Sequence, residues 1–308
     1  MTEPGSGHTP VLPKEVVALL APQPGDVIMD ATVGAGGHAR LLARAAAPDG
    51  VLYGLDVDAA ALKIAEERLA GCGCRVVLHR RNFADLALVL AEWHIPGVAV
   101  LLADLGVSSM QLADPQRGFS FESDGPLDMR MDDHLERRAA DLVNTLSERQ
   151  LSDLIYQYSQ ERFSRRIAKV LCSARHEQRI TRTRQLTEMV CKAVGAHPRA
   201  RRSKIHPATR TYQALRIAVN DELAVLARLL EQAPRCLNPG GRIGIISFHS
   251  LEDGLVKRDF RRRKEQGIYE IVTKRPVLAG EDERRSNPRA RSAKLRVARR
   301  TDREWQAA

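Results

Sequence analysis

A glycine-rich turn in the stretch MDATVGAGGHARLLA (29–43) is the first feature of the chain with a chemical use. Its glycines Gly34, Gly36 and Gly37 lack side chains, so a ligand could approach the backbone closely there. A dinucleotide fingerprint would have a third glycine at position 39, where the helix packs beside a bound pyrophosphate. This chain has alanine at that position. The turn therefore favours a nucleoside ligand without a pyrophosphate.

Acidic and aromatic residues follow at the ends of the next apolar runs. Asp56 lies 22 residues beyond Gly34 and could accept hydrogen bonds from both hydroxyls of an adenosine ribose. Phe83 could lie against an adenine ring, and Asp104 closes the run LLAD. S-adenosylmethionine (SAM) combines an adenosine with a sulfonium and an amino-acid end, and it has no phosphate. The pattern favours SAM, with a NAD-type cofactor and a purely structural turn as the alternatives.

The elements that must position these residues alternate between two patterns. Short apolar runs typical of buried strands are separated by stretches with helical periodicity, such as HARLLARAAA and AAALKIAEERLA. This alternation predicts a parallel sheet covered by helices on both faces, with ligands at the carboxyl ends of its strands. The predicted strands are 26–32, 50–58, 74–80 and 98–106.

The pattern changes after the fourth predicted strand. Residues 111–132 are rich in turn formers and charges and are too irregular for a strand or a helix. Loops of this length are often functional. Helical patterns follow over 147–177 and 181–194. We interpret 112–205 as an inserted helical domain that recognises the substrate.

The strand and helix alternation then resumes. Residues 211–237 predict one long helix or two consecutive ones, and the apolar run RIGIISF predicts a further strand. The segments IYEIVTKRPVLAG and AKLRVARRT predict an antiparallel pair at the sheet edge. The core domain is thus expected to combine 1–111 with 206–308, the second part carrying a basic C-terminal region.

Charge points to the class of partner. The 308 residues carry a net charge of +10, and basic residues cluster in RARRSK (199–204) and KRDFRRRK (257–264). Such clusters favour a polyanion, most commonly nucleic acid, through contacts with phosphates that carry little sequence information. A solvated helix face is the alternative for 257–264.

Composition also limits cofactor and location. The five cysteines are an odd number without a CxxC pair, so neither a disulfide framework nor a four-cysteine zinc site is expected, and no metal site is predicted. The N-terminal residues lack the features of a signal peptide, and no apolar run approaches the length of a membrane span. These features predict a cytoplasmic protein without a membrane partner. The oligomeric state stays open, a homodimer being one possibility.

Several longer blocks resemble one family closely. They include VGAGGHARLL (33–42), RGFSFESDGPLDMRMD (117–132), HPATRTYQALRIAVNDEL (206–223) and GGRIGIISFHSLED (240–253). Together they resemble the bacterial 16S ribosomal RNA cytosine-N4 methyltransferases. The resemblance covers nearly the whole chain, and the block at 117–132 is its most specific part.

The resemblance implies a fold, a reaction and a cofactor. The fold is that of a class I SAM-dependent methyltransferase, an α/β protein with a Rossmann-like doubly wound sheet, an antiparallel C-terminal pair and an inserted helical domain. The reaction is methylation of the N4 amine of cytosine 1402 of 16S rRNA in the small ribosomal subunit. The family's SAM-binding residues correspond here to Gly36, Gly37, His38, Asp56, Phe83, Asp104 and Gln111.

The catalytic residues are less apparent than the cofactor site. A cytosine amine is a poor nucleophile because its lone pair is delocalised, so it needs orientation and an acceptor for its developing positive charge. Many amino-methyltransferases carry Asp, Asn or Ser before Pro-Pro-aromatic at the end of the fourth strand. This chain has Asp104-Leu105-Gly106-Val107 instead. We expect Asp104 or a nearby backbone carbonyl to orient the amine, with help from Ser108 or Ser109.

Two other functions are compatible with a SAM fold and a basic chain. One is a DNA cytosine-N4 or adenine methylase, which the missing Pro-Pro-aromatic tetrapeptide disfavours. The other is a non-catalytic RNA-binding ribosome assembly factor that has kept a vestigial SAM fold. The intact Gly36, Gly37, Asp56 and Asp104 argue against that second alternative.

Overall fold

The computed structural model describes residues 9–196 and 206–303, which belong to two compact units. The first unit combines Met1–Gly106 with Leu223–Ala308, and the second is Val107–Glu222. The basic cluster at 199–204 lies outside the described residues.

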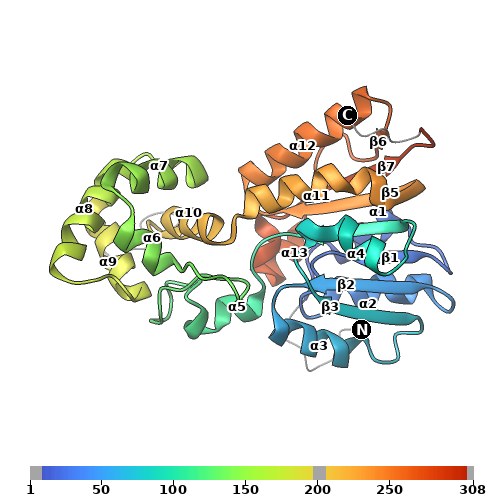
Figure 1. The fold of residues 1–308 in the computed structure, drawn as a ribbon, viewed down its shortest axis with the longest axis horizontal. Helices are drawn as coiled ribbons and strands as arrows, with labels where there is room; N and C mark the ends of the chain where they lie inside the picture. Colours follow the sequence, from blue (N-terminus) through green and yellow to red (C-terminus); the bar gives the residue numbers. More distant parts are fainter. Residues whose placement is uncertain (1–8, 197–205, 304–308) are drawn as a thin grey trace. The chain divides into compact units, whose positions relative to one another are not determined.

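One sheet forms the centre of the first unit (Figure 1). Within the described residues its seven strands have the order β3-β2-β1-β4-β5-β7-β6. Neighbouring strands from β3 to β5 are parallel, whereas β7 pairs antiparallel with both β5 and β6. The predicted doubly wound sheet with an antiparallel C-terminal pair is thereby confirmed. The strands are β1 (Val27–Asp30), β2 (Val51–Asp56), β3 (Arg75–Arg80), β4 (Val98–Asp104), β5 (Leu237–Ser247), β6 (Tyr269–Ile271) and β7 (Lys294–Arg300).

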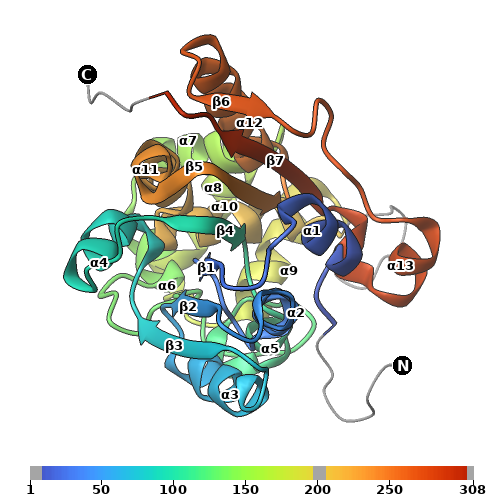
Figure 2. The same cartoon turned by 90° about the vertical axis from the view of Figure 1, so that its right-hand side faces the viewer.

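Helices cover both faces of this sheet (Figure 2). Successive strand residues point to opposite faces, so Met29 of β1 belongs to one buried cluster and Ile28 to the other. The Met29 cluster includes residues of α4 (Leu86–Glu92), α11 (Glu222–Cys236) and α12 (Ser250–Glu265). The Ile28 cluster includes residues of α1 (Pro13–Leu20), α2 (Gly37–Ala46) and α3 (Ala59–Leu69).

The second unit is helical and has a core of its own. Its buried residues come from the loop after α5 and from the helices α6 to α10. These helices are α5 (Ser109–Ala113), α6 (Ala139–Thr145), α7 (Glu148–Ser159), α8 (Ser164–Glu177), α9 (Thr183–Val194) and α10 (Thr209–Asn220).

The boundaries of this unit differ from the expected 112 and 205. It begins at Val107 and ends at Glu222, because α10 packs against α7 and adds Tyr212 and Leu215 to the helical core. The helical pattern of α10 does not tell from the sequence alone which core the helix will join.

Two helical stretches are divided at positions where one residue has a left-handed backbone. The stretch 147–177 forms α7 and α8, which separate at Gln160 with φ 53°. The stretch 211–237 contributes to α10 and α11, which separate at Asp221 with φ 49°. Across 9–196 and 206–303, no helix combines the length and the apolar character that crossing a membrane requires.

Candidate active site

Three carboxylates end neighbouring parallel strands of the first unit. Asp30 ends β1, Asp56 ends β2 and Asp104 ends β4, and β1 pairs with both of the other strands. Burial raises the pKa of Asp30 to about 7 and that of Asp56 to about 6, and it also raises the pKa of Asp104. The charges of Asp56 and Asp104 add to the rise at Asp30. The carboxyl edge of the sheet is therefore acidic, and burial brings the pKa values of Asp30 and Asp56 close to neutral pH.

Asp56 is held in place by the backbone around it. The Gly34 amide donates to Asp56 Oδ2 over 2.8 Å, and the Asp58 amide donates to Asp56 Oδ1 over 2.9 Å. Asp58 in turn caps α3, where its side chain accepts from the Ala60 amide. Each Asp56 oxygen has further acceptor capacity, since a carboxylate oxygen can accept more than one hydrogen bond. The geometry suits an acceptor for a pair of ligand hydroxyls.

The two adjacent glycines have a packing explanation. Gly36 has φ +80°, and a Cβ there would lie 3.4 Å from Ala65 Cα and from Leu69 Cγ. A Cβ on Gly37 would lie 3.3 Å from Pro10. We had explained these glycines by the approach of a ligand. In the structure, Gly36 is required by its left-handed backbone, and the missing side chain of Gly37 lets the turn lie against the N-terminal segment.

His38 connects the N-terminal segment with Asp104. Its Nε2 atom donates to the Val11 carbonyl over 2.7 Å, because a carbonyl oxygen can only accept. Its Nδ1 atom lies 3.6 Å from Asp104 Oδ2. The Asp104 amide donates to Thr32 Oγ1 over 2.6 Å, which fixes the end of β4. The imidazole thus lies beside one oxygen of the Asp104 carboxyl group, at a distance longer than a hydrogen bond.

The other oxygen of Asp104 has no such contact. Within the described residues, Oδ1 is buried and has no hydrogen-bond partner. Burial is the largest influence on the raised Asp104 pKa, Glu252 adds to it, and His38 and Arg289 oppose it. A buried acceptor without a donor costs free energy that a ligand donor or cation would offset. Asp104 is thus suited to accept a hydrogen bond or a positive charge.

Phe83 follows β3, the strand that pairs with β2 in the sheet. It begins a short 3-10 helix (Phe83–Asp85) and is half-buried against the cluster that contains Met29. The Asn82 side chain accepts from the Ala84 amide over 2.9 Å and fixes the start of this turn. The ring of Phe83 is therefore held by packing while part of it remains accessible.

Ser108 and Gln111 belong to the second unit, where they form a capping box at the start of α5. The Gln111 amide donates to Ser108 Oγ over 3.1 Å, and the Ser108 amide donates to Gln111 Oε1 over 3.0 Å. Gln111 is buried. Both side chains thus have a structural role in the turn, and the spacing Ser108-x-x-Gln111 is the sequence signal that indicates it.

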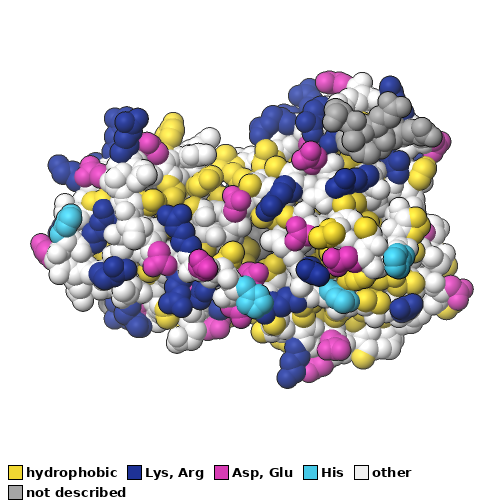
Figure 3. All heavy atoms as spheres, viewed as in Figure 1, with side chains coloured by type: hydrophobic (Ala, Val, Ile, Leu, Met, Phe, Trp, Pro, Cys, Tyr) yellow, Lys and Arg dark blue, Asp and Glu magenta, His cyan; other side chains and the backbone are white. Residues whose placement is uncertain are grey.

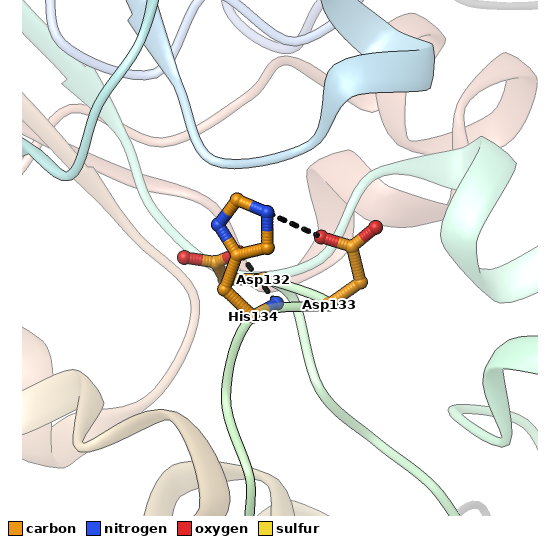
Figure 4. Close-up of side chains that lie close together, drawn as sticks. All are labelled: Asp132, Asp133 and His134. Atoms are coloured by element: carbon orange, nitrogen blue, oxygen red, sulfur yellow. Dashed lines mark hydrogen bonds and ion pairs between the residues drawn. The ribbon is translucent and has the colours of Figure 1, made fainter.

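One further cluster contains side chains of the kind that bind metals. Asp132, Asp133 and His134 of the second unit lie close together (Figure 4), with potential ligand atoms within 4.8 Å of one another. The two ring nitrogens of His134 face different carboxylates, at 3.8 Å from Asp132 and 3.9 Å from Asp133. His134 is 75% exposed. A surface turn in which the His134 amide donates to Asp132 Oδ1 over 3.0 Å accounts for the closeness of these two residues.

Comparison with known proteins places the chain in a family. The profile of the MraW methylase family matches residues 5–301. A relative from Geobacter sulfurreducens is 50% identical over 94% of this chain and 98% of its own length. Relatives from Syntrophotalea carbinolica and Sorangium cellulosum are 48% and 50% identical, over 97% and 96% of this chain and 100% and 91% of their own. The chain belongs to the MraW methylase family. All three relatives are named ribosomal RNA small subunit methyltransferase H.

Membership of the MraW methylase family decides the cofactor question. The chain is a SAM-dependent methyltransferase, as its resemblance implied. The predicted cofactor, SAM, is therefore confirmed and a NAD-type cofactor is not favoured, whereas the part that the turn at Gly34 plays in binding it stays a prediction.

The structure adds residues that the sequence did not single out. The Thr32 hydroxyl oxygen accepts a hydrogen bond from the Asp104 amide, and the Val11 carbonyl accepts one from the His38 imidazole. The positive charge of Arg289 opposes the rise of the Asp104 pKa. Neither Val11 nor Arg289 has a role in the site that the sequence predicts. They are far apart in the chain, so only the folded structure relates them to the acidic edge.

Proposed function

We propose that this enzyme transfers a methyl group from SAM to the N4 amine of cytosine 1402 of 16S rRNA in the small ribosomal subunit. The observation that carries the proposal is about 50% identity, over nearly the whole of both chains, with relatives named ribosomal RNA small subunit methyltransferase H. The atom and the nucleotide come from the resemblance of the motifs. The cytoplasm, where small subunits are assembled and used, is the location that goes with this substrate.

The acidic edge of the first unit fits SAM by its chemistry. SAM presents two ribose hydroxyls, an ammonium group and a sulfonium, and the edge presents carboxylate acceptors. We assign the ribose to Asp56, the adenine to Phe83, and the positively charged end to the buried Oδ1 of Asp104. Gly36, Gly37 and His38 shape the turn beside them. Bound SAM supplies an activated methyl group, and the cofactor roles of these residues, with that of Gln111, are predictions.

Asp104 is also the group that we propose acts on the amine. When a carboxylate accepts a hydrogen bond from the amine, it fixes the direction of the nitrogen lone pair. Its negative charge also balances the positive charge that develops on nitrogen. The raised pKa lets Asp104 accept the proton that nitrogen must lose after methylation. His38 lies beside the carboxylate, and we assign the assisting hydrogen bond to the hydroxyl of Ser108, whose own hydrogen the capping box does not use.

The variant Asp104→Asn tests this assignment. It keeps the shape of the side chain but can neither hold a negative charge nor accept the amine proton. We expect turnover at saturating SAM to fall about a hundredfold or more, the usual contribution of acid–base catalysis. Turnover is measured with labelled SAM, and SAM affinity is measured separately by calorimetry. Full turnover at saturating SAM would remove Asp104 as an essential charged group.

Labelled SAM also tests the substrate. Small subunits, protein-free 16S rRNA and DNA are offered side by side, and the modified nucleotide is located by mass spectrometry. We expect label in rRNA at cytosine N4. Label only in DNA would support a DNA methylase, and RNA binding without label would support an assembly factor. The same preparation, examined by sedimentation, separates a monomer from a homodimer.

A further inference from the structure

Helix α12 carries a row of basic side chains that the active site does not use. Lys257, Arg258, Arg261 and Lys264 are all exposed. Residues three, four and seven apart lie on one face of a helix, so these four share a face that we call the α12 basic face. Figure 3 shows Lys and Arg side chains gathered over this helix. Glu265 is the acidic residue nearest in sequence on the same side.

Asp259 and Asp253, two acidic residues of α12, pair with arginines that are not part of the α12 basic face. Asp259 points inward and is 7% exposed, with Arg262 Nη2 at 2.6 Å and Arg263 Nε at 3.6 Å from its Oδ1. Asp253 accepts from Arg296 Nε over 2.7 Å on its Oδ1. In the part of the chain that the structure describes, no carboxylate lies within ion-pair distance of Lys257, Arg258, Arg261 or Lys264. The α12 basic face therefore keeps its positive charge.

The helix that carries this face is firmly anchored. Val256 and Phe260 are buried in the core of the first unit, and the Phe260 ring meets the Tyr269 ring edge-on at 5.7 Å. From Lys257 to Lys264 the helix rises by about 10 Å, so the cations form a fixed row rather than a flexible tail. Such an array loses little conformational freedom when it binds a chain of phosphates.

The α12 basic face also has a defined relation to the acidic edge. Asp104 lies opposite Ile246 in the sheet, and α12 begins at Ser250, immediately after β5 ends at Ser247. The row of cations thus starts about 10 Å along the helix from the edge that carries Asp104. A polyanion that presents one of its bases at this edge could continue along the helix.

We propose that the α12 basic face contacts the phosphate backbone of the RNA substrate. This inference rests on the proposed function and adds the surface that holds the RNA. Cations that neutralise phosphates release counterions, so they supply affinity and salt dependence without reading bases. The α12 basic face therefore contributes to the binding of any RNA that reaches the active site. It does not select cytosine, because phosphate contacts carry no sequence information.

The test compares two double variants with the same change of charge. Lys257→Gln/Arg261→Gln removes two cations from the α12 basic face. Lys63→Gln/Arg68→Gln removes two from α3, whose exposed surface also carries Glu66 and Glu67. Binding to protein-free 16S rRNA and to small subunits is measured over a series of KCl concentrations, with melting temperatures and SAM affinity as checks on folding.

Each phosphate contact contributes about 0.7 to 0.9 to the slope of log affinity against log salt. We expect the α12 variant to lose about 1.4 to 1.8 from that slope and to bind more weakly at low salt, with SAM affinity unchanged. The α3 variant should keep the wild-type slope. A wild-type slope in the α12 variant would overturn the inference while leaving the methyltransferase function intact.

Other outcomes identify other partners. Weaker binding of the α12 variant to small subunits but not to protein-free rRNA would indicate a protein partner, and this overturns an RNA contact. Arg165 and Lys169 of α8 are exposed as well, so Arg165→Gln/Lys169→Gln forms a third arm. A loss of salt dependence in the α8 variant alone would indicate that the phosphate contacts lie on the second unit instead of α12. Wild-type protein that neither binds nor methylates rRNA would overturn both this inference and the proposed function.

Discussion

Asp30, Asp56 and Asp104 show how a single residue type serves different purposes within one sheet edge. Asp56 accepts two backbone amides, and Asp104 keeps one oxygen for a ligand. Asp30 is 1% exposed, accepts a hydrogen bond from the Thr32 amide over 3.1 Å, and has a pKa raised to about 7. Burying this charge costs folding free energy, so the site is assembled at some expense of stability.

The pH dependence of stability should report this cost. In the unfolded chain Asp30 has a pKa of about 3.9, and in the folded protein it is about 7. Between these values the folded state binds the proton more tightly, so stability is full below about pH 4 and falls as the pH rises through 7. The variant Asp30→Asn keeps an oxygen for the Thr32 amide and cannot ionise. We expect it to be more stable than wild type by a few kcal/mol at pH 8.

Urea unfolding at pH 5 and pH 8 measures this difference. The advantage of Asp30→Asn should be smaller at pH 5, where nearly all of the folded wild-type Asp30 is protonated. Asp49→Asn, at an exposed position, is the control and should change stability equally little at both values. If the advantage of Asp30→Asn did not depend on pH, Asp30 would not be the buried group that titrates.

For single residues, the sequence predicts which side chains lie at the sheet edge better than it predicts which other residues they contact. Asp56 and Asp104 could be placed at the edge because each ends an apolar run. The packing of Gly36 against Leu69 and the contact of His38 with Val11 join segments far apart in the chain. Their geometry depends on how two helices and the N-terminal segment meet, which spacing along one sequence does not contain.

Among the elements, the loop that contains the block 117–132 is held by specific backbone contacts. The Met131 amide donates to Asn220 Oδ1 over 2.7 Å, and Asn220 Nδ2 donates to the Met129 carbonyl over 2.8 Å. Gly118 has φ +70°, and a Cβ there would lie 2.2 Å from the Pro126 carbonyl oxygen. The irregular sequence of this loop therefore encodes one compact conformation.

Two glycines with nearly the same backbone conformation allow a matched test of that compactness. Gly118 and Gly195 have φ +70° and +69°, but nothing lies within 4 Å of a Cβ on Gly195. We expect Gly195→Ala to cost about 1 kcal/mol from backbone strain alone. Gly118→Ala should cost about 2 kcal/mol or more beyond that, because the Pro126 backbone must move. Chemical unfolding of both variants measures the difference, and equal costs would show that the loop yields easily.

The sequence predicted most elements because periodicity is a local property. It located the strands β1 to β4 and the C-terminal antiparallel pair. It did not locate the break between α7 and α8, where Gln160 takes a left-handed conformation without a glycine or proline to mark it. It also placed α10 with the sheet, because an amphipathic helix does not specify which core will receive its apolar face.

At the scale of the whole molecule, the chain builds two separate cores. The clusters that contain Met29 and Ile28 draw all their residues from the first unit, and the helical cluster draws all of its residues from the second. Each core can therefore gain or lose stability by changes within its own unit. Periodicity alone predicted elements of the fold, whereas the long motifs shared with one family identified the reaction.

Amide hydrogen exchange can test the independence of the two cores. In Gly118→Ala, we expect exchange protection to fall in α6, α7 and α10, which share the helical core with the loop. Protection in β1, β4 and β5 should match the wild type, because local stability follows the cooperative unit that contains an amide. An equal loss of protection in both units would instead describe a single cooperative molecule.

The position of β7 between β5 and β6 has a consequence for how the protein is made. Translation proceeds from the N-terminus, so all of Val107–Glu222 has been synthesised before the ribosome reaches β5. The nascent second unit can mature early, whereas the sheet lacks the antiparallel partner of β5 until Lys294–Arg300 has been made. We expect the fold that carries the methyl-transfer site to be completed only once Lys294–Arg300 has been made, so that the polypeptide gains its activity later than its second unit matures.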